Sequence, residues 1–163
     1  MLQGFVTCAY GVHTVGRVLV LYGVCNALSS IGFGLIRKRV GCLPLLLLGA
    51  TINLGVIAAM LVWQPSPSTL PVVYAMAATW ATADAIWQTQ INSLYGSLFI
   101  NHEKAAFSNY KLWESLGFLF AFVTSATGVC ILPKIIIMII SLVCGMAGYL
   151  MIEYIQREEK SAK

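Results

Sequence analysis

The stretch LPVVYAMAATWATADAIWQTQINSLYGSLF, residues 70–99, decides how the whole chain is interpreted. It is long enough to cross a membrane, and Asp84 is the one charged residue within it. A charged side chain at the centre of a bilayer costs roughly 2.5–3.5 kcal/mol on insertion scales, so such residues face a bundle interior or a water-filled cavity. Asp84 therefore predicts which side of this segment faces the interior of a helical bundle.

The composition of the chain is that of a membrane protein. Of its 163 residues, 59% are apolar and 10% are charged, and the mean hydropathy is +0.83, whereas soluble domains are about 25% charged. The charges are clustered between long apolar runs, which predicts an all-α, polytopic transmembrane helix bundle in which each span has the ~20 residues that a bilayer requires and the third and fourth are longer. We expect an outer loop over residues 1–16, a cytoplasmic tail over 156–163, and five spans at about 17–36, 43–63, 70–99, 105–131 and 135–155.

The distribution of lysine and arginine predicts the orientation. With five spans, the loops on one side hold nearly all of the basic residues: Arg37, Lys38, Arg39, Lys104, Lys111, Arg157, Lys160 and Lys163. The other side holds only Arg17 and Lys134. The positive-inside rule then places the C-terminus in the cytoplasm and the N-terminus outside or in a lumen. The basic residues are divided among several loops, which argues against a nucleic-acid partner.

The basic run Arg37, Lys38 and Arg39 has two interpretations. We expect it to form a cytoplasmic loop between the first two spans, where membrane topology alone accounts for its charge. Binding of anionic lipid is the alternative.

A polar stripe runs along the third span. Asp84, Gln88 and Asn92 recur every four residues, and Tyr95 lies close to the same helical face. One interpretation is a cavity or substrate pathway with a titrating carboxylate. The other is a structural role, in which these side chains form hydrogen bonds to neighbouring helices. The sequence leaves both open.

The fourth span supplies a second acidic residue and a face of small residues. Glu114 lies at a depth similar to that of Asp84, so it either shares a proton with Asp84 or pairs with Lys111 near the membrane surface. A small-residue face allows another helix to approach closely, and here it consists of Gly117, Ala121, Ser125 and Gly128.

Sets of residues that would indicate catalysis are not evident in the sequence. It contains no recognisable Ser/His/Asp set, phosphate-binding loop or cysteine pair with metal-ligand spacing. We therefore expect no catalytic residues, no metal and no cofactor, and we do not expect an enzyme.

Two stretches carry a resemblance to a known family. They are WATADAIWQTQINSLYG, residues 80–96, and AAFSNYKLWESLGF, residues 105–118. Together they resemble the C-terminal half of the uncoordinated-93 family, in its homolog A branch, within the major facilitator superfamily. The resemblance implies that the five spans are helices eight to twelve of a twelve-helix protein, which agrees with the odd number of spans and with the outer N-terminus. We therefore expect this chain to be the C-terminal portion of a longer architecture.

The resemblance also implies a function. The founding member of the family resembles a regulatory subunit of a two-pore potassium channel, and another branch escorts innate immune receptors from the endoplasmic reticulum to endosomes. The leading hypothesis is therefore a non-enzymatic potassium-channel regulator in the plasma membrane, with membrane lipids and a membrane-protein partner such as that channel. A proton-coupled transporter of a small solute, with Asp84 as the coupling carboxylate, is the first alternative. A trafficking escort for other membrane proteins is the second.

Overall fold

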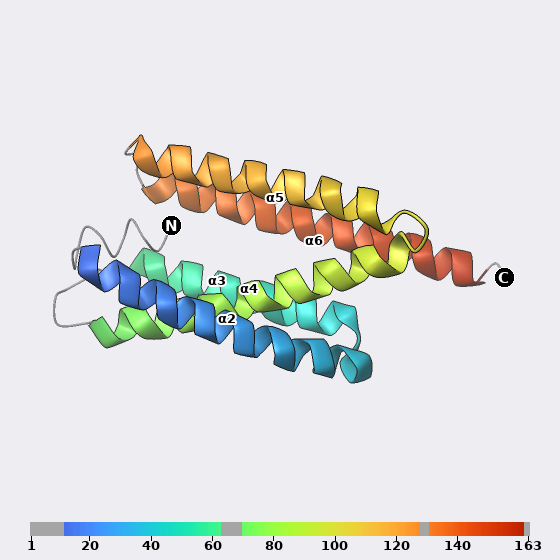
Figure 1. Ribbon diagram of the computed structural model, residues 1–163, viewed down its shortest axis with the longest axis horizontal. Coiled ribbons are helices and arrows are strands. Elements are labelled where there is room, and N and C mark those ends of the chain that lie inside the picture. The colour runs from blue at the N-terminus through green and yellow to red at the C-terminus, as the bar shows by residue number, and fades with distance from the viewer. Residues whose placement is uncertain (1–11, 63–69, 128–130, 162–163) are drawn as a thin grey trace. The chain divides into compact units, whose positions relative to one another are not determined.

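The computed structural model describes residues 12–62, 70–127 and 131–161, and every structural statement below concerns these residues. Within them the chain is entirely helical, which confirms the all-α class (Figure 1). The helices are α2 (Val12–Val40), α3 (Cys42–Val62), α4 (Leu70–Leu98), α5 (Glu103–Ala126) and α6 (Ile131–Ser161).

The helix bounds differ from the expected spans mainly at the ends. Helix α2 begins at Val12, so residues 12–16 of the expected outer loop are helical, and the rest of that loop lies outside the described residues. Helix α5 ends at Ala126 rather than near residue 131. Helix α6 continues to Ser161, through much of the segment expected to be a tail.

The chain divides into two compact units. Residues 1–128 form the first unit, which contains α2, α3, α4 and α5. Residues 129–163 form the second, whose described part consists of α6.

Three of the described helices are long and apolar enough to cross a membrane. They are the segments Thr14–Val40, Cys42–Val62 and Pro133–Ile155. Helix α4 is not among them because Asp84 and its neighbouring amides lower its apolar character, and α5 carries charged residues in its first turns. A membrane-spanning chain is thus supported by these three helices, while five spans and a major-facilitator fold stay predictions.

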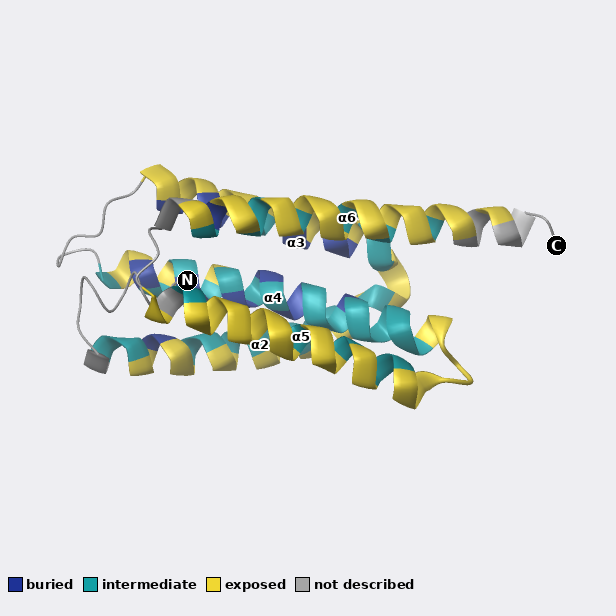
Figure 2. Cartoon of the chain, turned by 90° about the horizontal axis from the view of Figure 1, so that it is seen from above, coloured by how far each residue is buried: buried dark blue, intermediate teal, exposed yellow. Residues whose placement is uncertain are grey.

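Helix α4 lies at the centre of the first unit. It packs along α2 on one side and along α3 on another, and it is darker in the burial colouring than α5 or α6 (Figures 1 and 2). Small side chains make this close packing feasible, because Ala77, Ala81, Ala83 and Ala85 are fully buried. Near its N-terminus, Val73 and Ala77 form an apolar cluster with Val18 of α2.

The contact between α3 and α4 depends on a glycine. A Cβ atom added at Gly49 would lie 3.2 Å from Cγ2 of Ile86 and 3.5 Å from Nε1 of Trp87. A larger residue at this position would therefore push α3 away from α4. The absence of a side chain at Gly49 sets the separation of the two helices.

Short turns link the helices of the first unit. Gly41 ends α2 in the left-handed region, with φ 88°, and its N–H donates a hydrogen bond of 3.0 Å to the carbonyl oxygen of Arg37. This is the αL form of helix termination, which favours glycine. In the turn between α4 and α5, the N–H of His102 donates to the carbonyl oxygen of Phe99 at 3.0 Å.

Candidate functional site

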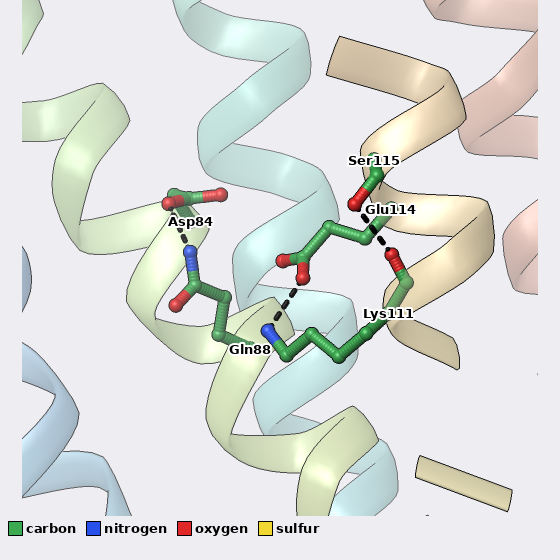
Figure 3. Close-up of polar contacts among 5 residues, drawn as sticks. All are labelled: Asp84, Gln88, Lys111, Glu114 and Ser115. Carbon is green, nitrogen blue, oxygen red and sulfur yellow. Dashed lines mark hydrogen bonds and ion pairs between the residues drawn. The ribbon is translucent and has the colours of Figure 1, made fainter. Parts of the chain in front are cut away.

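The candidate site is centred on Asp84, in the middle of α4 and half-buried. One of its carboxylate oxygens, Oδ2, accepts three hydrogen bonds. Tyr22 donates from its hydroxyl at 2.9 Å, Asn26 from Nδ2 at 2.8 Å and Gln88 from Nε2 at 2.8 Å. The bond between Asp84 and Gln88 is visible in Figure 3. We refer to these four residues as the Asp84 network.

The network joins two helices because of helical spacing. Tyr22 and Asn26 are four residues apart on α2 and therefore share one face, which is turned to α4. Gln88 is four residues after Asp84 on α4. A single carboxylate oxygen is thus reached from two turns of α2 and from the next turn of its own helix.

Weaker polar contacts extend the same interface. Nδ2 of Asn26 lies 3.4 Å from the carbonyl oxygen of Ala81, and the hydroxyl of Ser29 lies 3.4 Å from Oγ1 of Thr82. The hydroxyl of Ser30 lies 3.5 Å from Oδ1 of Asn26. The contacts with Ala81 and Ser30 orient the Asn26 amide, so that its nitrogen is presented to Asp84.

The electrostatic character of the site follows from its donors, which are all neutral. Hydrogen bonds to an ionised carboxylate are about twice as strong as those between neutral groups, and a low local dielectric strengthens them further. Neither Tyr22 nor Asn26 contributes a charge, so the dipoles of its neutral donors stabilise the Asp84 carboxyl group. The arrangement is suited to holding α2 against α4.

The C-terminal half of the predicted stripe, Asn92 and Tyr95, has different surroundings from Asp84 and Gln88. Asn92 is half-buried, and its side chain has no hydrogen-bond partner among the described residues. Tyr95 belongs to an aromatic group at the junction of α4 and α5, with ring centroids 5.4 Å from Tyr110, 5.7 Å from Phe99 and 6.2 Å from Phe107. The stripe is therefore continuous in sequence, but its two halves have different contacts.

Glu114 of α5 is paired with Lys111 rather than with Asp84. The ammonium group of Lys111 contacts Oε2 of Glu114 and lies 5.2 Å from the ring centroid of Tyr110. Figure 3 shows the Glu114 side chain turned toward α4, where Asp84 and Gln88 lie. The side chain of Lys111 is 62% exposed, so this ion pair contributes little to stability.

The small-residue face of α5 has no other described helix of the first unit against it. Gly117 and Ala121 are exposed, and a Cβ atom added at Gly117 would meet nothing within 4 Å. The side chain of Ser125 and all of Gly128 lie outside the described residues.

The expectation that Arg37, Lys38 and Arg39 form a loop is wrong. All three lie in the last turn of α2, because the helix continues until Gly41 ends it. Positive charge is favourable there, since the C-terminus of a helix carries partial negative charge.

Within the described ranges, no group of three His, Cys, Asp or Glu residues is arranged to hold a metal ion.

Tyr22 and Asn26 are the site residues that the sequence analysis missed. A signal for them exists, because Tyr22, Asn26, Ser29 and Ser30 recur at spacings of three and four along a segment that is otherwise mostly apolar. This polar face of α2 is the counterpart of the stripe on α4.

Comparison with known proteins identifies relatives of the chain. The chain is 44% identical over 152 residues to unc-93 homolog A of Danio rerio, covering 93% of this chain and 32% of that protein. It is 37% identical over 154 residues to unc-93 homolog A of Homo sapiens, covering 94% of this chain and 34% of the relative. With unc-93 of Caenorhabditis elegans, named as a candidate potassium channel regulatory protein, it shares 34% identity over 152 residues, covering 93% of this chain and 21% of the relative.

The chain spans about a third of the length of the homolog A relatives that it matches. No protein-family model matches it. No solved structure matches it either.

Proposed function

This chain is homologous over nearly its whole length to the unc-93 homolog A proteins, consistent with the C-terminal part of that family, and we propose that it acts as a non-enzymatic regulator of a potassium channel. The observation that carries the proposal is the similarity to the Caenorhabditis elegans relative, whose name describes regulation of a potassium channel. The partner is a membrane protein, contacted by helices of this chain within the bilayer.

The Asp84 network supports a regulatory rather than a transporting role. Oδ2 of Asp84 is engaged by Tyr22, Asn26 and Gln88 of the same chain. A carboxylate held in this way fixes the position of α2 against α4. A regulator that acts by presenting a defined helical surface requires such fixed packing.

The proposal includes a membrane arrangement. We infer that α4 and α5 cross the bilayer together with the three more apolar helices, because α2 and α3 cover the polar and small residues of α4. The C-terminus then lies in the cytoplasm, as the basic residues predict. The plasma membrane is the proposed location, as the site of the potassium channel that the chain is proposed to regulate.

The test is a current measurement on cells that express a potassium channel with and without this chain. The proposal expects the channel current to change on co-expression, and expects Asn26→Leu, which breaks the contact between α2 and α4, to reduce that change. Thr79→Val is the matched control, because Thr79 is exposed and bonds only within its own helix. Unaltered currents at equal surface expression of both proteins would reject the proposal.

A proton-coupled transporter is the second candidate, and one observation favours it. Asp84 and Asn92 are both only half-buried, and the Asn92 side chain has no hydrogen-bond partner in the described part of the chain. The stripe therefore retains a polar side chain that can form hydrogen bonds to a solute. Uptake of a small solute into vesicles, driven by a proton gradient and abolished by Asp84→Asn, would establish this function in place of the first.

A further inference from the structure

Helix α2 has an outer face that no other described helix of the first unit covers. Five branched aliphatic side chains lie along it, and each is more than half exposed: Val20, Val24, Leu28, Ile31 and Leu35. Their spacing of three and four residues places them on one stripe. We call this stripe the outer face of α2. It points away from Tyr22 and Asn26, which contact α4.

The chemistry of the outer face fits acyl chains better than another helix. Helices associate in membranes through small residues that let their backbones approach, and the stripe contains none. The small residues of α2, such as Gly16, Gly23 and Ala27, are exposed as well but fall on a neighbouring face. The outer face thus presents only flexible or branched hydrocarbon to its surroundings.

Basic residues bound the outer face at both ends. Lys38 and Arg39 follow Leu35 by three and four residues and so continue the same stripe, and Arg17 precedes Val20 by three. All three basic residues are exposed. The helical rise from Arg17 to Lys38 is about 31 Å at 1.5 Å per residue, which matches the ~30 Å thickness of the hydrocarbon core of a bilayer.

The charges at the C-terminal end have no acidic partner on their own hairpin. Helices α2 and α3 contain neither aspartate nor glutamate. Lys38 and Arg39 therefore present two positive charges, without an acidic partner on α2 or α3, directly beyond an apolar stripe. An amphiphile with a negative headgroup and hydrocarbon tails is complementary to this arrangement in both charge and polarity.

We propose that an anionic phospholipid binds along the outer face of α2, with an acyl chain against Leu28, Ile31 and Leu35 and its phosphate between Lys38 and Arg39. This inference rests on the proposed membrane location of the chain. It adds a lipid partner, at the outer face of α2, to the proposed channel-regulating role.

The first test measures headgroup selectivity. The full chain is reconstituted in phosphatidylcholine vesicles with spin-labelled phosphatidylglycerol or spin-labelled phosphatidylcholine, and the motionally restricted fraction of each lipid is compared. The wild-type chain is expected to prefer phosphatidylglycerol, and the preference should fall about fivefold for each basic residue removed by Lys38→Gln and Arg39→Gln. The matched control carries Lys104→Gln and Lys134→Gln, which remove the same charge from other helices and should preserve the preference.

The second test locates the apolar part of the site. A spin label is attached at Leu28→Cys in a chain whose native cysteines are replaced by serine. The label should be accessible to oxygen and shielded from a water-soluble nickel chelate, and inorganic phosphate at constant ionic strength should not displace phosphatidylglycerol. A label accessible to the chelate, or displacement by inorganic phosphate, would show a site for a free anion and overturn the proposal.

Two outcomes separate this inference from the proposed function. An equal loss of selectivity in the control and in the Lys38→Gln, Arg39→Gln chain would mean that net charge alone attracts the lipid, and the inference would fail while channel regulation stood. Retained selectivity with unaltered channel currents would reject channel regulation and leave the lipid site in place.

Discussion

The hydroxyl of Tyr22 offers a direct measure of what the Asp84 network contributes to folding. Tyr22→Phe deletes one donor to Oδ2 of Asp84, at 2.9 Å, and keeps the aromatic ring. Asn26 and Gln88 still donate to the same oxygen after the change. The substitution therefore weakens the network without removing it.

Two reference values bound the expected loss of stability. A hydrogen bond to a charged group contributes about 1.5–3 kcal/mol in soluble proteins, whereas interhelical hydrogen bonds in a membrane average about 0.6 kcal/mol with a maximum near 1.7. Two other donors share Oδ2, so the loss of one is partly compensated. We expect Tyr22→Phe to lower the free energy of unfolding by about 1 kcal/mol.

The assay is unfolding of the full chain in mixed micelles, by titration with sodium dodecyl sulfate and detection of tryptophan fluorescence. Trp80 and Trp87 lie on α4 on either side of Asp84 and are half-buried, so they report on the packing of this helix. A double-mutant cycle combines Tyr22→Phe with Asp84→Ala, which removes the acceptor. The coupling free energy between the two substitutions should be about 1 kcal/mol, the whole effect of Tyr22→Phe on unfolding.

A control identifies effects that do not pass through Asp84. Tyr74 is a half-buried tyrosine of α4 that packs against the cluster of Val18, Val73 and Ala77. Tyr74→Phe should be additive with Asp84→Ala within about 0.5 kcal/mol. If the Tyr22 cycle is equally additive, the network does not hold α2 to α4 and our reasoning about the site is wrong.

Three further substitutions test the packing of the first unit. Gly49→Leu should lower the free energy of unfolding by about 1–3 kcal/mol, because a Cβ atom at this position would lie 3.2 Å from Ile86. The control is Gly55→Leu, which has open space around it and should not destabilise the chain in the same micelle titration. Gly41→Ala should cost about 1 kcal/mol in that titration, because alanine disfavours a φ of 88°; no loss would show that the turn relaxes freely. Tyr95→Ala should speed amide hydrogen exchange at the start of α5 by removing three ring contacts, and unchanged exchange would contradict a role for the aromatic group in docking α5.

The sequence alone was sufficient for the helical class and for the family resemblance. Long apolar runs leave helices as the structure that satisfies backbone hydrogen bonds in lipid, and the motifs over residues 80–96 and 105–118 pointed to the unc-93 relatives that the comparisons then confirmed. Periodicity also placed Asp84 and Gln88 on one face of α4, where they are hydrogen-bonded. These properties follow from local composition and from the period of the helix.

The partners of Asp84 were decided only by the tertiary structure. Tyr22 and Asn26 are about sixty residues away in the chain, and helical periodicity relates residues only within one helix. Tertiary contacts also placed Tyr95 in an aromatic group with residues of α5, so residues that share one stripe in sequence have separate roles. The physical reason is that a helix presents a face by its own period, while the side chains opposite that face depend on how the helices pack.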